Sequence, residues 1–528
     1  MENLEICAAE TAIPEGKMAI TAENEWTRKL ILVPVFVFFT SFFSFVARHR
    51  FIDGDEGFYL LASRLVLEHK APYMDFFYTQ APLLPYAYAL WIKLFGISWF
   101  SARSFSAALT TILGLLICEH VCQETRRWVA GLAAVVLFAS STLIFAWFPL
   151  VKTFSLAALF LFGAYVIVTR LSSTSSPWLV AVAGLLFGLS VDTRSYVVGL
   201  APIFLWWIFR HSEARNGIAS ILWFLCGFTI GIVPCAYLFV ASPDRFLFNN
   251  LRYHALRSDA GLIGAWKSKM AIARIVLFGA ENNGVQFSIL STMSFAAILV
   301  LRMRRGAALL AFLIAFVLGF ISILPTPPLT QYFCMCVPFL IVAAVCGTSD
   351  YVTSLRGARP KRIAVLASIA VLAIFVASSV PSFRRYLVTG DKVIGVRGAN
   401  DAPNWTLERV SAVSKAIDQV AMPKEKIASF WPGYIFESKT EPYPGFENNF
   451  GQLVASKLTP EERARYHVIS SDEIQNDFAA HSPRIGVVGN QESSGFRMSA
   501  GEAILRANGY TAVRMIGRTS IYVCCSRQ

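Results

Sequence analysis

Two adjacent carboxylates near the start of the chain have the chemistry of an acid–base site. Asp55 and Glu56 follow the first long apolar run, 30–47. A carboxylate beside a reacting hydroxyl can act as a general base, and a carboxylate pair can also bind a divalent cation. The same side chains could instead cap a helix that begins at Gly57, because negative charge stabilises a helix N-terminus. The pair is therefore a candidate catalytic site with a structural alternative.

Other polar residues stand at the ends of later apolar runs. Lys152 precedes the run 153–170, and Arg194 lies at a break in the stretch 177–210. Further polar residues expected on the same side are Asp75, Tyr78, Gln80, Gln331 and Tyr332. Ionisable groups at membrane depth are costly and usually functional, so this set suits a substrate with an anionic head and an apolar tail. Alternatively, Lys152 is a snorkelling interfacial lysine and Arg194 a plain loop residue.

The elements that must position these residues are membrane-spanning helices. Hydrophobic residues make up 55% of the 528 residues and charged residues 15%, with a mean hydropathy of +0.53. Soluble domains carry about 25% charge. The stretch 177–210 breaks at Asp192-Thr193-Arg194, which predicts two short helices there and about eleven spans in total. The other predicted spans are 30–47, 101–122, 128–147, 153–170, 218–241, 285–301, 306–324, 330–347 and 362–380. The sequence thus predicts a polytopic α-helical membrane protein.

The basic residues between these runs indicate the orientation. If segment 1–29 is cytoplasmic, every second connection between spans lies inside the cell. These inner connections carry the arginines, as the positive-inside rule requires, for example Arg126, Arg127, Arg302, Arg304 and Arg305. Two long loops, 48–100 and 243–284, then lie outside. The second loop holds six Arg or Lys residues, Arg252 and Arg257 among them, and three Asp or Glu residues. This net positive charge on the outer side invites a functional explanation. Basic residues spread over short loops argue against nucleic-acid binding.

The chain after Pro381 has the composition of a soluble protein. Strand and helix patterns alternate, which predicts an α/β domain over 382–528 after the transmembrane domain 30–381. The expected strands are 426–431, 467–470, 484–488, 510–516 and 519–524, and the expected helices 459–466, 471–480 and 499–508. An odd number of spans from a cytoplasmic start predicts that this domain is periplasmic or extracellular.

Several segments together resemble a known enzyme family. These are 55–62 (DEGFYLLA), 71–77 (APYMDFF), 81–86 (APLLPY), 188–194 (GLSVDTR) and 331–333 (QYF). They resemble GT-C membrane glycosyltransferases, in the branch of protein O-mannosyltransferases, the lipid A aminoarabinose transferase and lipopolysaccharide-core galacturonic acid transferases. The resemblance covers most of the chain, and the first outer loop is its specific part.

The resemblance implies a function and a role for each candidate residue. A polyprenyl-phosphate-linked sugar would be transferred with inversion to a hydroxyl of a lipid, polysaccharide or protein, at the outer face of a bacterial inner membrane. Asp55 would be the base and Glu56 its partner, and a divalent metal, if one is bound, would contact both. The implied phosphate-binding residues are Lys152, Arg194, Gln80, Arg252 and Arg257, and the implied substrate contacts are Tyr59, Asp75, Tyr78, Gln331 and Tyr332.

The sequence departs from the family pattern at two positions. Gln80 stands where many members have a lysine that contacts the donor phosphate, and Lys152 stands where many have an acidic residue. Lys152 would then supply the phosphate charge. The alternative functions are a transporter or flippase, or a ligase, for lipid-linked sugars. Transporters tend to show internal repeats and mid-membrane charges, and neither feature is visible in the sequence.

Overall fold

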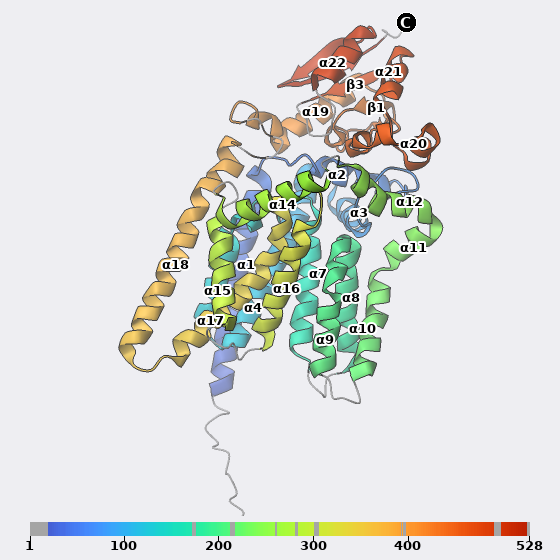
Figure 1. Ribbon diagram of the computed structural model, residues 1–528. Coiled ribbons are helices and arrows are strands. Elements are labelled where there is room, and N and C mark those ends of the chain that lie inside the picture. Colours follow the sequence, from blue (N-terminus) through green and yellow to red (C-terminus); the bar gives the residue numbers. More distant parts are fainter. Residues whose placement is uncertain are drawn as a thin grey trace, which may run out of the picture.

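The chain folds into a bundle of long apolar helices with a mixed α/β region at one end (Figure 1). The computed structural model describes residues 20–524 except 172–175, 212–216, 259–260, 280–283, 300–305, 392, 394–395, 397 and 490–497. Arg302, Arg304, Arg305 and most of the predicted cytoplasmic segment 1–29 lie outside the described residues. The bundle helices are α1 (Ile20–His49), α4 (Trp99–Thr125), α5 (Trp128–Ser140), α6 (Thr142–Phe145), α7 (Thr153–Thr169), α8 (Pro177–Thr193), α9 (Ala201–His211), α10 (Gly217–Gly231), α11 (Val233–Ala241), α15 (Gly284–Leu299), α16 (Gly306–Ile323), α17 (Val337–Ser354) and α18 (Ala358–Arg384).

The length and apolarity of these helices make the chain a multi-pass membrane protein. Among the described residues, five helices are long and apolar enough to cross a membrane, or six if the bent pair α10 and α11 is one span. Further apolar helices, including α5, α7 and α8, are shorter. The predicted break after α8 is present, because the chain turns at Arg194 into the 3-10 turn η2 (Ser195–Leu200). The total of eleven spans stays a prediction.

Glycines let α8 and α10 pack with their backbones in contact. A Cβ atom at Gly184 would lie 1.9 Å from the carbonyl oxygen of Phe224, and one at Gly227 would lie 1.8 Å from that of Ala181. Such small residues are typical of close helix pairs in membranes. This contact fixes α8, and therefore the position of Arg194 at its end.

The first outer loop contains two helices, α2 (Glu56–Leu67) and α3 (Leu83–Phe95). The sequence pattern predicts that both helices lie in the membrane interface. In the structure, the residues of α2 from Glu56 to Leu65 are all buried within the protein. Its polar side is covered by the C-terminal region: Arg64 donates to the carbonyl oxygens of Ser438 and, at 2.7 Å, Ile435. The helix is therefore held between the bundle and the C-terminal region.

The second outer loop and the link to the C-terminal region lie at the same end of the bundle (Figure 1). The second loop contains α12 (Pro243–Leu247), η3 (Phe248–Arg252), α13 (Tyr253–Leu256) and α14 (Gly261–Phe278). The 3-10 helix η4 (Thr330–Cys336) leads directly into α17 at this end, and the short π-helix η5 (Arg385–Thr389) follows the end of α18. The N-terminal end of α1 lies at the opposite end (Figure 1).

The C-terminal region contains a five-stranded sheet with strand order β2-β1-β3-β5-β4. Strands β1, β2 and β3 are parallel neighbours, whereas β5 pairs antiparallel with β3 and β4. The strands are β1 (Lys426–Ser429), β2 (Glu441–Pro442), β3 (Ile485–Val488), β4 (Thr511–Ile516) and β5 (Thr519–Val523), and the helices are α19 (Leu407–Val420), α20 (Pro460–Tyr466), α21 (Ser471–Ala479) and α22 (Met498–Ala507). Short 3-10 turns are η6 (Ala402–Trp405), η7 (Pro432–Tyr434), η8 (Asn449–Leu453) and η9 (Ala455–Lys457).

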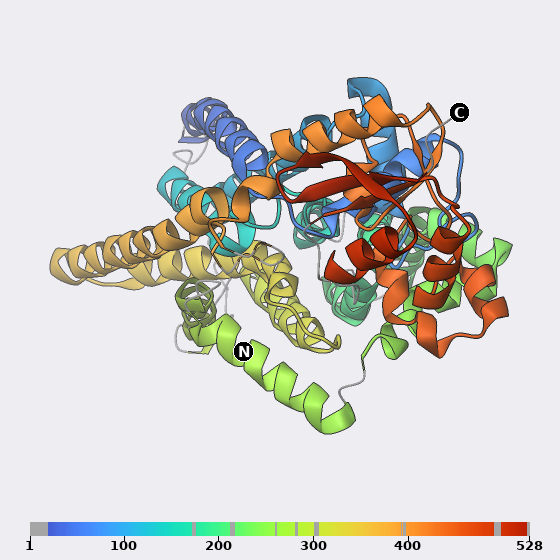
Figure 2. The same cartoon turned by 90° about the horizontal axis from the view of Figure 1, so that it is seen from above.

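Several details of this region differ from the sequence-based expectation, among them the short strand β2, which the sequence pattern did not indicate. The predicted strand 467–470 is absent, because His467 ends α20 in the left-handed conformation and Ser470 already caps α21. The helix α19 was not predicted, although Thr406 caps it and its apolar residues recur at helical spacing. Seen from above, the sheet covers one part of the bundle while α18 extends to the side (Figure 2).

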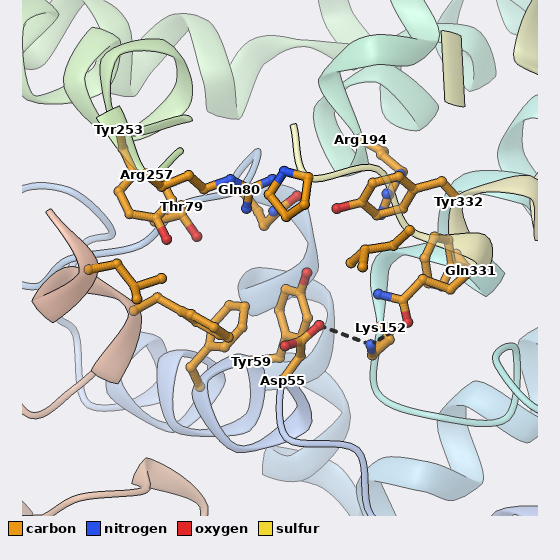
Figure 3. A pocket seen from close by; sticks show the side chains of 16 residues that line it. Asp55, Tyr59, Thr79, Gln80, Lys152, Arg194, Tyr253, Arg257, Gln331 and Tyr332 are labelled. Atoms are coloured by element: carbon orange, nitrogen blue, oxygen red, sulfur yellow. Dashed lines mark hydrogen bonds and ion pairs between the residues drawn. The ribbon is translucent and has the colours of Figure 1, made fainter. Parts of the chain in front are cut away.

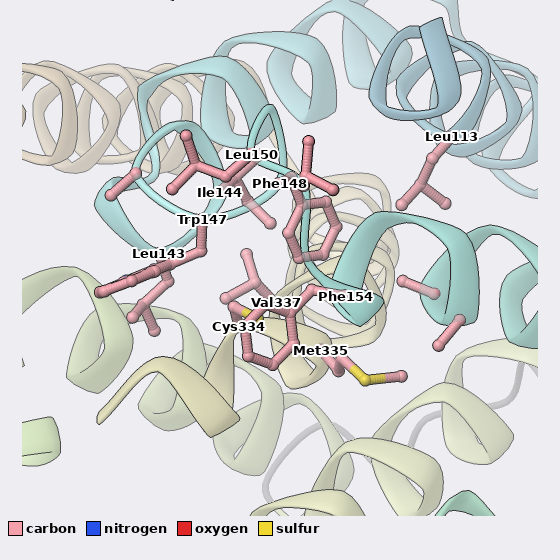
Figure 4. Close-up of a cluster of buried hydrophobic side chains, with 14 of the residues drawn as sticks. Leu113, Leu143, Ile144, Trp147, Phe148, Leu150, Phe154, Cys334, Met335 and Val337 are labelled. Carbon is pink, nitrogen blue, oxygen red and sulfur yellow. The ribbon is translucent and has the colours of Figure 1, made fainter. Parts of the chain in front are cut away.

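The C-terminal region is joined directly to the turn that carries the acidic pair. The indole Nε1 of Trp431 donates to the carbonyl oxygen of Gly54 at 2.8 Å. A Cβ atom at Gly57 would lie 2.7 Å from the backbone nitrogen of Gly433 and 2.8 Å from the Trp431 ring, so only glycine allows this approach. Apolar side chains from 143–154 and 334–337 form a buried cluster (Figure 4).

Candidate active site

A cavity lined by both charged and apolar side chains lies where the two outer loops, the bundle and the C-terminal region meet (Figure 3). Its volume is about 250 Å³. Its walls come from α2, the loops before α3 and α7, the turn after α8, the second outer loop, η4 and η8. The lining residues are Asp55, Phe58, Tyr59, Thr79, Gln80, Lys152, Phe154, Arg194, Tyr253, Arg257, Pro327, Leu329, Gln331, Tyr332, Phe450 and Leu453.

The Asp55 carboxylate faces the Lys152 ammonium across the floor of this cavity. Lys152 Nζ donates to Asp55 Oδ2 at 2.9 Å, the contact drawn in Figure 3. The same ammonium lies 2.7 Å from Asp53 Oδ1 and donates to Gln331 Oε1 at 3.1 Å. Asp53 was not singled out from the sequence, although the spacing Asp-Gly-Asp-Glu contains it. Lys152 thus holds two carboxylates and an amide oxygen together.

This geometry disfavours the capping interpretation of Asp55. Asp55 occupies the N-cap position of α2, but its side chain accepts no hydrogen bond from the helix. The carboxylate is 31% exposed and is directed toward the cavity and Lys152. Asp55 is therefore available to a substrate.

Glu56 has a different environment from its neighbour and does not line the cavity. Its carboxylate is fully buried and pairs with Arg103 of α4 at 2.6 Å and 2.8 Å. It also accepts hydrogen bonds from the backbone nitrogens of Asp53 (2.8 Å) and Val151 (3.1 Å). Val151 directly precedes Lys152. Glu56 therefore fixes the acidic turn (53–56) relative to the lysine loop, which is the segment 146–152 before α7. These contacts suit a positioning role, and the side chain does not reach the cavity.

Arg194 forms a second cationic wall of the cavity. Its guanidinium lies 4.4 Å from the ring centre of Phe154 and 5.1 Å from that of Tyr332, and it donates to Thr153. The side chain is buried, and its Nε has no hydrogen-bond partner among the described residues. A buried guanidinium that keeps a free donor is suited to an incoming anion.

The third wall comes from both outer loops and the C-terminal region. Arg257 Nε donates to the carbonyl oxygen of Thr326 at 3.3 Å, and Gln80 lies on the same side of the cavity (Figure 3). Phe450 packs edge-to-face on Phe58 at 5.5 Å and contributes an apolar surface. Cations therefore line the cavity on two sides, with apolar side chains between them.

Besides Glu56, three predicted site residues lie outside the cavity. Arg252 is exposed and pairs with Glu462 of α20 at 2.7 Å. Asp75 accepts a hydrogen bond from the backbone nitrogen of Ala71 at 2.7 Å, which closes a turn. Tyr78 is fully buried among aromatic rings. Tyr59, Gln80, Gln331 and Tyr332, by contrast, line the cavity with Asp55, Lys152, Arg194 and Arg257.

The surroundings determine how the central groups ionise. Burial in the cavity wall raises the pKa of Asp55 above its usual value; Lys152 opposes this effect and Asp53 adds to it. Burial alone would lower the pKa of Lys152, but the Asp53 and Asp55 carboxylates outweigh it and raise that pKa. Lys152 therefore stays protonated, and Asp55 is a stronger base than a free aspartate.

Comparisons with known proteins identify the fold that carries this cavity. Residues 79–239 match the family described as dolichyl-phosphate-mannose-protein mannosyltransferase. The crystal structure of ArnT from Cupriavidus metallidurans in the apo state superposes with a TM-score of 0.62 over 95% of this chain and 98% of that chain, at 14% identity. The chain has a GT-C glycosyltransferase fold. This confirms the resemblance that the sequence predicts.

A second ArnT structure extends the comparison. ArnT from Cupriavidus metallidurans bound to undecaprenyl phosphate superposes with a TM-score of 0.58, again over 95% of this chain and 98% of that chain, at 15% identity. No curated protein matches the chain in sequence. At these identities the structural matches establish the GT-C fold, and the residues of the cavity must supply the argument for chemistry.

Proposed function

We propose that the chain is a membrane glycosyltransferase that moves a sugar from a polyprenyl-phosphate donor to a hydroxyl acceptor, with inversion at the anomeric carbon. The observation that carries this proposal is the Asp55–Lys152 pair, which faces a cavity also lined by Arg194 and Arg257. A base, three cations and adjoining apolar surface fit a phosphate-linked sugar on a lipid. The solved complex of ArnT with undecaprenyl phosphate supports this donor class.

The proposed reaction is a single displacement. The acceptor oxygen attacks the anomeric carbon as Asp55 takes the hydroxyl proton, and the bond from that carbon to the phosphate oxygen breaks. The bonding electron pair leaves with the lipid phosphate, where Lys152, Arg194 and Arg257 offset the growing negative charge. Cations placed in advance stabilise such a transition state because they need not reorganise. A base of this kind contributes about 10²–10⁴ in rate.

We further propose that the cavity opens at the outer face of a bacterial inner membrane. The basic inner connections predict a cytoplasmic N-terminus, and eleven spans would then give a periplasmic or extracellular domain over 382–528. A C-terminal alkaline phosphatase fusion should be active in cells, and a fusion at residue 215 should be inactive. The reverse pattern would contradict the orientation without contradicting the chemistry.

The donor class is tested with purified protein in reconstituted membranes. Each donor is offered separately, as a polyprenyl-phosphate sugar or as a nucleotide sugar, with extracted envelope lipid, polysaccharide and protein as acceptors. We expect transfer from the lipid-linked donor only, and product analysis should show the opposite anomeric configuration from that of the donor. Efficient transfer from a nucleotide sugar with no lipid carrier present would refute the proposal.

A further inference from the structure

The Lys152 ammonium is enclosed by oxygen atoms in the way that a bound metal ion would be. Its three neighbours are Asp53 Oδ1 at 2.7 Å, Asp55 Oδ2 at 2.9 Å and Gln331 Oε1 at 3.1 Å. An ammonium has three N–H donors, so all are used. The Trp147 ring centre lies 4.9 Å from the nitrogen and covers another side. The lysine side chain is 3% exposed.

The same oxygens have the chemistry of a divalent-cation site. Mg²⁺ and Mn²⁺ are bound by carboxylate and amide oxygens, and they bridge acidic residues to substrate phosphates. Within the described part of the chain, no group of three or more His, Cys, Asp or Glu residues is placed to hold a metal ion. Two carboxylates and one amide converge here, and their shared centre is already taken by a positive charge that belongs to the protein.

The charges around this centre add up to a site for an anion. Among the charged residues that line the cavity, taken together with Asp53, two carboxylates stand against the three cations Lys152, Arg194 and Arg257, which leaves a net charge of +1. A further divalent ion would have to share its oxygens with a nearby ammonium, and the repulsion between like charges at such distances is large in a site of low dielectric. The lysine and a metal ion are therefore mutually exclusive.

We propose that the Lys152 ammonium takes the place of a divalent metal ion in this active site. The inference rests on the proposed function. Asp53 is the positioning residue that keeps the ammonium in place. The neutral Gln331 oxygen is the longest of the three contacts, so a donor phosphate oxygen displaces it most easily while both carboxylates remain bound. Transfer then proceeds without an added metal ion.

Two measurements on the full-length protein test this proposal. The first treats the wild-type enzyme with EDTA during the reconstituted transfer assay. We expect the transfer rate to change by less than about twofold. The second titrates Mn²⁺ into purified protein and follows the electron paramagnetic resonance signal. We expect no Mn²⁺ site in the wild type, a new site in Lys152→Ala, and its loss in the double variant Lys152→Ala/Asp53→Asn.

The matched control is Lys93→Ala, which removes an exposed lysine of α3 and should resemble the wild type in both measurements. EDTA inhibition that Mg²⁺ or Mn²⁺ reverses would overturn the proposal while leaving the glycosyltransferase function intact. Mn²⁺ binding to the wild type that Asp53→Asn abolishes would also overturn it, and so would the absence of any Mn²⁺ site in Lys152→Ala. The EDTA measurement needs no variant, so it decides the question even if Lys152→Ala does not fold. Failure of the wild type to use any lipid-linked sugar would refute the proposed function alone, because the Mn²⁺ titration reports on the cation site separately.

Discussion

The buried pair between Glu56 and Arg103 should control both the stability of the fold and the geometry of the cavity. Neither side chain is exposed, and the carboxylate accepts four hydrogen bonds, two from the guanidinium and two from backbone nitrogens. Arg103 also donates to the carbonyl oxygens of Ala47 and Arg50 at 2.8 Å and 2.6 Å. The pair therefore links the end of α1, the acidic turn, α4 and the lysine loop.

The substitution Glu56→Gln keeps the shape of the side chain and removes its charge. Arg103 is then left as a buried cation without a counter-ion, and breaking a buried pair in this way costs about 3–5 kcal/mol. The matched control is Glu68→Gln in the same segment, because Glu68 is 35% exposed and pairs with Arg64 over one helical turn. Arg64 itself is buried, but Glu68 stays in contact with solvent, so this pair is less desolvated than the Glu56–Arg103 pair and its loss should cost less.

The assay is thermal or denaturant unfolding of the purified proteins in detergent, combined with the transfer assay. We expect Glu56→Gln to lose several kcal/mol and most of its activity, and Glu68→Gln to stay close to the wild type. The double variant Glu56→Gln/Arg103→Met should be more stable than Glu56→Gln, because it also removes the unpaired cation. Equal stability of Glu56→Gln and Glu68→Gln would refute the reasoning.

Two further predictions follow from contacts around the same turn. Gly57→Ala places a methyl group 2.7 Å from the backbone nitrogen of Gly433 and against the Trp431 ring, so the C-terminal region should detach from the turn. Limited proteolysis of the variant should then be faster than that of the wild type, and transfer should be lost. An unchanged digestion pattern would contradict this prediction. The raised pKa of Asp55 predicts that transfer falls as the pH drops through that pKa, since the base must be ionised. Lys152→Met removes a charge that lowers this pKa, so the acidic limb of the pH–rate profile should move to higher pH, and a limb at the wild-type position would argue against Asp55 as the titrating base.

Much of the cavity could be predicted because topology alone brings its residues together. Asp55, Lys152, Arg194 and Gln331 each stand at an end of an apolar run, and alternating spans place those ends on one side of the membrane. Periodicity and apolar length were sufficient to find them. The break at Arg194 was visible for the same reason, since a charged residue interrupts an apolar stretch.

The contacts that specify the site could not be read from local patterns. The separation between Glu56 and Arg103 is 47 residues, and nothing near either residue indicates the pairing. Phe450 reaches the cavity from the C-terminal region, through packing between segments far apart in the chain. Arg252 was expected in the site because its loop is basic, but the loop composition does not distinguish an inward arginine from one that pairs with Glu462.

The most direct test of the central claim is the transfer rate of Asp55→Asn with a polyprenyl-phosphate sugar. Asparagine keeps the size and a hydrogen-bond acceptor but cannot take a proton, so the change separates a base from a structural residue. We predict a rate reduced by about 10²–10⁴, the usual contribution of a general base, with unchanged insertion and thermal unfolding. Near-normal transfer by Asp55→Asn, with a correctly folded protein, would contradict the account.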